Sequence, residues 1–82
     1  MSLQFEIKDF ILQNFLFSSD RNALADSDSL LQKGIVDSTG ILELITHLEE
    51  FYKIEVHDDE MLPSNLDSVD AIAAFVTRKR DA

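Results

Sequence analysis

The segment from Ile41 to Tyr52 places its apolar residues at the spacing of one face of an α-helix. These residues are Ile41, Leu44, Ile45, Leu48 and Tyr52. Their intervals of three and four residues match a helical period of 3.6. Asp37 stands just before this pattern, where a carboxylate can accept a backbone N–H and favour the positive helix end. The sequence therefore predicts a helix from about Ser38 to Lys53, with Asp37 as its N-cap.

Two further helices are predicted, one toward each end of the chain. The last one has apolar positions at Val69, Ile72, Ala73 and Val76, with Phe75 on the flank. Asp67 or Ser68 can cap it, and the three bases at 78–80 lie at its carbonyl end, where cations are favoured. The first segment, residues 3–17, is apolar on several sides, and Leu12 falls outside its helical stripe. Its length and its lack of Gly and Pro favour a helix.

The connections contain turn residues and no sustained period. Residues 18–36 are predicted to form a long loop, in which Gly34 takes a left-handed turn. Four apolar residues are expected to hold this loop on the core: Leu30, Leu31, Ile35 and Val36. Residues 57–65 allow at most one short helix, around Asp59 and ended by Pro63. The expected fold is therefore all-α, a small four-helix bundle of three main helices and one short helix, forming a single domain over residues 1–82.

Composition excludes several classes of protein. The chain has no cysteine, so it has no disulfide framework, no thiolate zinc site and no cysteine nucleophile. It has no run of about 18 apolar residues that could span a membrane. Its first residues lack the basic-then-apolar order of a secretory signal. We expect a monomer in the cytoplasm, with no membrane span.

The negative charge is concentrated in the second half of the chain. The net charge is −9, and residues 37–70 hold ten acidic residues against one base, Lys53. A field of this sign repels nucleic acid and attracts basic protein surfaces. Acidic faces also keep small domains soluble, and both explanations stay open.

Familiar catalytic and metal-binding patterns do not fit this sequence. Asp26 and Asp28 have the spacing of a calcium loop, but leucines stand where such a loop needs an oxygen ligand and a glycine. No G-x-S-x-G elbow is present, so a hydrolase triad is not indicated. His47 is expected on a solvated helix face. His57, beside two aspartates, could bind a metal weakly, but surface polarity explains it better. We therefore predict no metal site and no enzyme.

The dipeptide Asp-Ser occurs four times, and only Asp37-Ser38 opens a long amphipathic helix. The other pairs begin at Asp26, Asp28 and Asp67. A serine at the first helical position exposes its hydroxyl beside free backbone N–H groups, where the helix end favours an anion. Nothing near Ser38 in the sequence could activate it as a nucleophile. It is better suited to modification by another protein than to catalysis.

The stretch "GIVDSTGILELITHLEEFYKIEV" resembles the phosphopantetheine attachment region of acyl carrier proteins. That family has an Asp-Ser pair at a helix start, an "EL" pair, an acidic "LEE" segment and a closing aromatic residue. Here they are Asp37-Ser38, Glu43-Leu44, residues 48–50 and Tyr52. The resemblance covers nearly the whole chain. It implies that a phosphopantetheinyl transferase attaches 4′-phosphopantetheine from coenzyme A to Ser38. Acyl or aminoacyl groups then travel as thioesters between a loading ligase and downstream synthases or transferases.

The resemblance also implies a docking face on the helix after Ser38. Candidate partner-binding residues are Thr39, Leu42, Glu43, Thr46, Glu49, Glu50, Val56 and Met61. Leu42 lies about 100° from the buried stripe and could contact a partner or simply edge the core. Ile45, Leu48 and the aromatic residues are expected to line the interior in which family members shelter an acyl chain.

Two residues after the serine depart from the fatty-acid type. Thr39 and Gly40 stand where those proteins usually have a leucine and an acid. Ser-x-Gly is more similar to D-alanyl carrier proteins and other stand-alone aminoacyl carriers, which favours a specialised pathway. The alternative is a helical protein-interaction module that has the same fold and is never modified.

Overall fold

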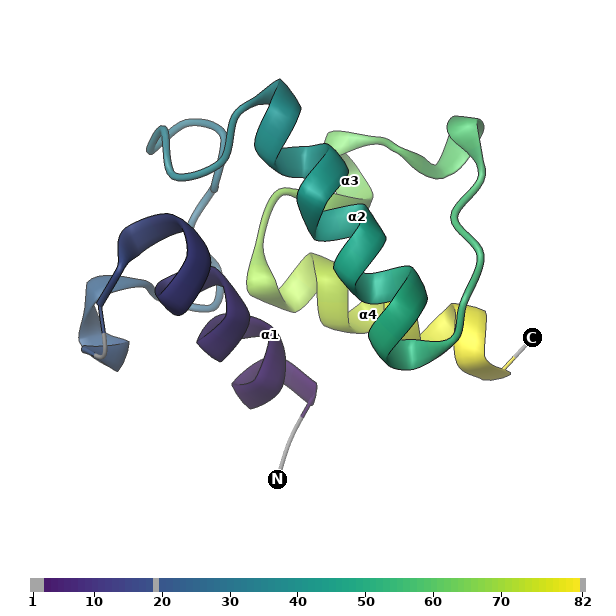
Figure 1. Ribbon diagram of the computed structural model, residues 1–82, viewed down its shortest axis with the longest axis horizontal. Coiled ribbons are helices and arrows are strands. Elements are labelled where there is room, and N and C mark those ends of the chain that lie inside the picture. Colours follow the sequence, from purple (N-terminus) through teal and green to yellow (C-terminus); the bar gives the residue numbers. More distant parts are fainter. Residues whose placement is uncertain (1–2, 19, 82) are drawn as a thin grey trace.

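The computed structural model describes residues 3–18 and 20–81, and this part of the chain is helical and contains no strand (Figure 1). The α-helices are α1 (Leu3–Ile11), α2 (Ser38–Tyr52), α3 (Pro63–Leu66) and α4 (Val69–Asp81). A π-helical turn, η1 (Leu12–Leu16), continues α1, and two 3₁₀ turns follow, η2 (Arg21–Ala23) and η3 (Asp58–Glu60). The prediction of a small all-α bundle with three main helices and a long first loop is confirmed, but the one short helix lies at a different place than predicted. No helix in these ranges is both long and apolar enough to cross a membrane.

One core lies where α1, α2 and α4 meet. The side chains of Ile11, Leu44 and Ile72, one from each helix, are 0% exposed. The predicted stripes are confirmed, because Leu44, Ile45, Leu48 and Tyr52 of α2 are buried, and so are Val69, Ile72, Ala73 and Val76 of α4. The long loop adds Leu24, Leu30 and Val36. Packing of these residues therefore fixes the position of α2 relative to α1 and α4.

The first helix extends to residue 16, one residue short of the predicted segment 3–17, and its last turn is a π-turn. A π-turn places one extra residue in the helix and so rotates the side chains that follow. Leu12 falls outside the helical stripe predicted from the sequence, yet its side chain is only 1% exposed, and the preceding residue, Ile11, is also buried. The turn ends at Phe17, whose backbone is left-handed with φ 52° and whose N–H donates to the carbonyl of Leu12.

The long first loop is attached to the start of α4 through Asp67. The carboxylate of Asp67 accepts hydrogen bonds from the backbone N–H of Leu31 at 2.9 Å and from the hydroxyl of Ser29 at 2.6 Å. Its carbonyl accepts from the N–H of Leu30 at 2.7 Å. Gly34 has φ 69°, as predicted. Leu31 was expected to hold the loop on the core, which is wrong, since its side chain is 40% exposed.

Two details between α2 and α4 differ from the sequence prediction. Pro63 was expected to end a short helix, but it opens α3. The first helical position suits proline because no partner is needed for the missing N–H. The helix expected around Asp59 is only the 3₁₀ turn η3. Ser68, one of the two candidate caps, accepts from the N–H of Ala71 at 3.0 Å and so caps α4.

Candidate functional site

Ser38 is the first residue of α2 and is exposed to solvent. Asp37 is in extended conformation, and its Oδ1 accepts the N–H of Gly40 at 2.7 Å, so the predicted N-cap is confirmed. No hydrogen bond or ion pair joins the Ser38 side chain to another residue that the structure describes. The hydroxyl is therefore available to another molecule, at the end of a 15-residue helix where an anion is favoured.

The serines of the other Asp-Ser pairs lie in different surroundings. Ser29 donates to Asp67 and accepts from the N–H of Gln32, which ties it into the loop. Ser68 is occupied as the cap of α4. Ser27 is exposed, but it lies in a turn with no helix behind it. Of the four serines, only Ser38 combines exposure with a long helix.

The aspartates of the loop pairs also have partners inside the chain. Asp28 accepts the N–H of Ala25 at 2.9 Å and pairs with Lys33 at 3.1 Å. The hydrogen bond from Ala25 and then the contact with Lys33 lower the pKa of the Asp28 carboxyl. Asp26 pairs with Lys8 of α1 at 2.9 Å. These two carboxylates therefore hold the loop in place.

Gly40 has a structural role that the sequence did not reveal. It is buried, and a Cβ built at this position would lie 2.9 Å from Cε1 of Phe15 and 3.1 Å from Cγ1 of Val36. Real Cβ atoms essentially never approach another atom within 3.0 Å. The π-turn η1 thus packs directly against the first turn of α2. The Ser-x-Gly spacing follows from this close approach.

The predicted partner-binding residues divide into exposed and buried groups. Thr39, Leu42, Glu43, Thr46 and Glu50 are exposed on α2. Leu42 is 59% exposed, so it does not edge the core. Glu49 is half-buried and accepts the N–H of Val56 at 3.0 Å. The prediction that Val56 contacts a partner is wrong, because its side chain lies in the core and is only 6% exposed.

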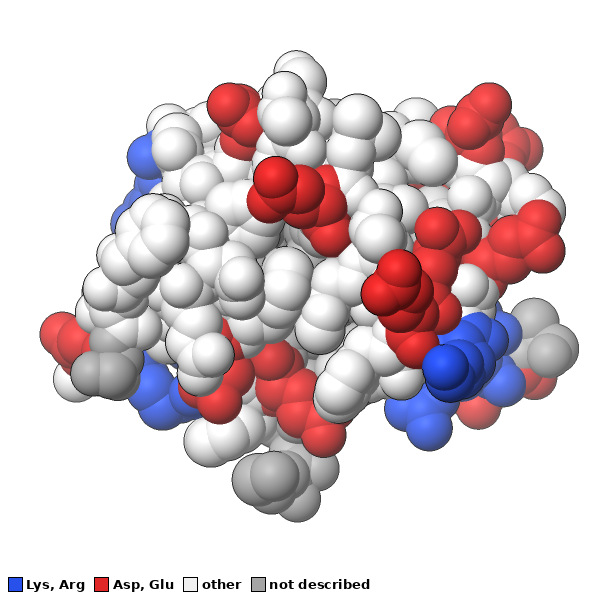
Figure 2. All heavy atoms as spheres, in the orientation of Figure 1, with Lys and Arg blue, Asp and Glu red and all other residues white. Residues whose placement is uncertain are grey.

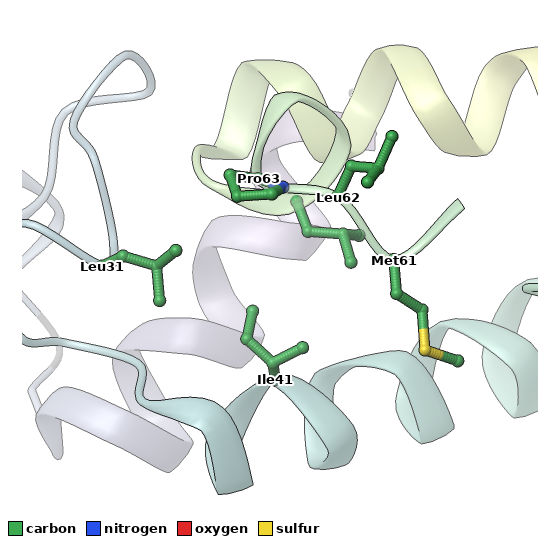
Figure 3. A pocket seen from close by; sticks show the side chains of 6 residues that line it. Leu31, Ile41, Met61, Leu62 and Pro63 are labelled. Carbon is green, nitrogen blue, oxygen red and sulfur yellow. The ribbon is translucent and has the colours of Figure 1, made fainter. Parts of the chain in front are cut away.

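A small apolar pocket opens one helical turn from Ser38. Its volume is about 70 Å³, and its lining is Leu31, Ile41, Met61, Leu62, Pro63 and Leu66. Figure 3 shows Leu31 from the loop and Ile41 from α2 pointing into the same space, with Pro63 across from them. Of these residues, only Met61 was predicted from the sequence as a site residue. The apolar run 61–63, between acidic residues and a helix, is the signal that could have found the pocket.

The shelter expected around Ile45 and Leu48 is not where the pocket lies. These side chains are 4% and 0% exposed, respectively, and they pack in the core without lining the pocket. Buried stripe positions are close-packed in the interior and leave no space for an acyl chain.

The surroundings of His47 differ from the prediction, whereas His57 is exposed, as predicted. His47 is not solvated on a polar face: its ring stacks on Phe10 of α1, with centroids 3.7 Å apart, and on Phe51 at 5.2 Å. Burial lowers the pKa of its imidazole, and the nearby Glu50 opposes this. The backbone N–H of His57 donates to the Glu60 carboxylate at 3.0 Å. Within residues 3–18 and 20–81, no three His, Cys, Asp or Glu side chains are grouped to hold a metal ion.

Acidic side chains are spread over the face that carries α2. Figure 2 shows basic side chains near the C-terminal end of α4 and at the opposite edge, while acidic side chains are spread across the face and also reach both edges. Glu60 is paired with Lys79 at 2.8 Å, and this bond, followed by the N–H of His57, lowers the pKa of the Glu60 carboxyl. The exposed acids of α2, Glu43 and Glu50, have no such ion pair within the described residues.

Comparison of the sequence with protein-family models and with curated proteins gave no match.

Proposed function

We propose that this chain is a carrier protein that is modified at Ser38 with 4′-phosphopantetheine and carries acyl or aminoacyl groups as thioesters. The observation that carries the proposal is the exposed Ser38 hydroxyl at the capped start of a 15-residue helix. Ser38 Oγ forms a bond to the β-phosphorus of coenzyme A, and the bond from that phosphorus to the adenosine 3′,5′-bisphosphate breaks. The serine proton passes to a base of the transferase. The resulting phosphodiester anion lies at the positive end of α2.

The surface next to Ser38 suits this modification. Asp37 already accepts the Gly40 N–H, which keeps the first turn of α2 formed and the serine at its tip. The arm, when attached, supplies the thiol that a chain without cysteine lacks. Thr39 and Leu42 are exposed next to it and would contact either the arm or the transferase.

The small pocket favours short cargo. Its volume of about 70 Å³ is under half of the roughly 150 Å³ of an apolar cavity that binds benzene. A long acyl chain would therefore require the segment around Met61 to move away from Ile41. A short acyl or aminoacyl group requires no such movement, in keeping with the Ser-x-Gly resemblance to aminoacyl carriers.

Partner enzymes are expected to present basic surfaces. Glu43 and Glu50 are exposed on α2, beside Leu42. Complementary charge speeds encounter, and a buried apolar contact slows dissociation. The chain would act as a substrate of these enzymes and perform no catalysis of its own.

The test is transfer of phosphopantetheine to the purified full chain. Incubation with coenzyme A, Mg²⁺ and a broad-specificity transferase is expected to add one phosphopantetheinyl group to the intact mass. Ser38→Ala is expected to stay unmodified, while Ser27→Ala, a matched change at an exposed serine after an aspartate, is expected to be modified normally. An unchanged mass with an active transferase would refute the carrier function. Modification of the Ser38→Ala chain would show that another serine is the site.

A further inference from the structure

A second depression lies away from Ser38, between α1 and the second half of α2. It has a volume of about 350 Å³ and is lined by Phe5, Glu6, Asp9, Phe10, Gln13, Asn14, His47 and Phe51. We call it the α1–α2 groove. None of these residues belongs to the Ser38 site or to its pocket. Figure 1 shows α1 alongside the lower half of α2, on the side away from α3.

One wall of the groove is a continuous row of aromatic rings. Phe10 of α1 stacks on His47 of α2 at 3.7 Å with the planes 8° apart, and His47 stacks on Phe51 at 5.2 Å. Phe51 is 58% exposed at the open end of the row. Because burial lowers the pKa of His47, its ring is neutral at physiological pH and adds no positive charge.

The rim of the groove is acidic. Glu6 and Asp9 are three residues apart on α1 and so lie on the same side of the helix. Glu6 accepts a hydrogen bond at 2.9 Å from the hydroxyl of Tyr52 and belongs to no ion pair among the described residues. No Lys or Arg lines the groove within the described chain. The groove therefore combines aromatic faces with an un-neutralised carboxylate.

The edge of the groove already shows which group such a surface binds. The guanidinium of Arg21 lies 3.8 Å from the centroid of the Phe5 ring, donates to the carbonyl of Phe5 and pairs with Asp9. A planar cation fits here because one face stacks on a ring while its N–H groups reach a carboxylate. The same two elements, a carboxylate and aromatic faces, recur farther along at Glu6, His47 and Phe51. Among the described residues, no Lys or Arg lines that end.

We propose that the α1–α2 groove binds an arginine side chain of a partner protein, between Glu6 and the rings of His47 and Phe51. Identifying the partner as an enzyme that acts on the Ser38 arm rests on the proposed function, whereas the binding chemistry does not. His47 and Phe51 follow Ser38 by 9 and 13 residues, or about 14 and 20 Å along the helix axis. A protein interface of ordinary size spans that length. A partner whose active site faces Ser38 would reach the groove.

The test is a ¹H–¹⁵N NMR titration of the full chain with the peptide acetyl-Leu-Arg-Leu-amide. Shift changes are expected at Glu6, Phe10, His47 and Phe51. The peptide with citrulline in place of arginine, which keeps the shape without the charge, is expected to bind about tenfold more weakly. Phe51→Ala should weaken binding of the arginine peptide about threefold to fivefold. Phe17→Ala, a matched loss of a phenylalanine that is 84% exposed and outside the groove, should leave it unchanged.

Three results would overturn this inference. One is the absence of localised shifts at about 5 mM peptide. Another is equal binding of the citrulline peptide. The third is a set of shift changes spread over the acidic residues of segment 55–60 and unchanged by Phe51→Ala, as general electrostatic attraction would give. Phosphopantetheine transfer is measured separately, so a chain that is modified but does not bind arginine refutes only the groove. Arginine binding without modification refutes only the carrier function.

Discussion

Replacement of Asp37 tests how the start of α2 is fixed. Oδ1 of Asp37 accepts the Gly40 N–H at 2.7 Å, and its charge lies at the N-terminus of a 15-residue helix. Loss of the cap in Asp37→Ala costs about 1 kcal/mol, and loss of the charge adds about 0.5 kcal/mol. The expected total is about 1.5 kcal/mol, which lowers Tm by roughly 6–12 °C in a domain of this size.

Asp37→Asn separates these two contributions. Asparagine keeps an oxygen that can accept the Gly40 N–H, so only about 0.5 kcal/mol should be lost. That loss should shrink at about 1 M salt, where the Debye length is about 3 Å. Urea denaturation of both variants measures the difference. Glu43→Gln, which removes an exposed charge farther along α2, is the matched control and should change stability little.

Equal losses for Asp37→Ala and Asp37→Asn would refute the assignment of the cap. So would a loss below about 0.3 kcal/mol for Asp37→Ala, because an N-cap removed without cost does not fix the helix start. Phosphopantetheine transfer should also slow more in Asp37→Ala than in Asp37→Asn, because the first turn of α2, which presents Ser38, frays more in the alanine variant.

Two further predictions concern the packing around α2. Gly40→Ala should lower the free energy of unfolding, measured by urea denaturation, by about 1 kcal/mol. Overlap of the added Cβ with Phe15 and Val36 outweighs the gain in helix propensity. The loss should be smaller in a Phe15→Ala background, and a stabilised Gly40→Ala would contradict the close approach of η1. His47 has a lowered pKa, so the folded chain binds fewer protons than the unfolded chain, whose histidine titrates near 6.5. The free energy of unfolding should therefore fall as pH drops below 6.5. His47→Phe keeps an aromatic ring in the stack, so its Tm should fall less than that of the unmodified chain between about pH 7.5 and 5.5. An equal fall in Tm for both chains would refute this prediction.

The sequence allowed α2 and α4 to be predicted closely because each has a buried stripe and clear end signals. The N-cap at Asp37, the buried positions of α4 and the left-handed Gly34 depend on residues close together in the chain. Such local patterns determine which side of a helix is buried. They therefore also placed Ser38 at the start of α2.

Contacts between distant segments could not be predicted in the same way. His47 lies on the polar side of its own helix, and only the position of Phe10, 37 residues earlier, turns that side into a stacked row. Val56 looks exposed in an acidic segment, but its side chain is buried in the core and its N–H donates to Glu49. Pro63 can either end or open a helix, and the packing of Leu66 decides which. These features depend on the tertiary arrangement.

The attachment of the long loop to Asp67 has a consequence for how the molecule opens. Ser29, Leu30 and Leu31 all bond to this one residue, so the polar fastening of segment 29–31 is concentrated at Asp67, while Asp26 separately ties the earlier part of the loop to Lys8. Breaking it releases the segment that carries Leu31 over the pocket, while the stacked aromatic contact between α1 and α2 stays intact. The loop is thus expected to unfold as a sub-global unit at lower free energy than the helices. Solvent exchange at the Leu30 and Leu31 amides would then report how often the pocket beside Ser38 is uncovered.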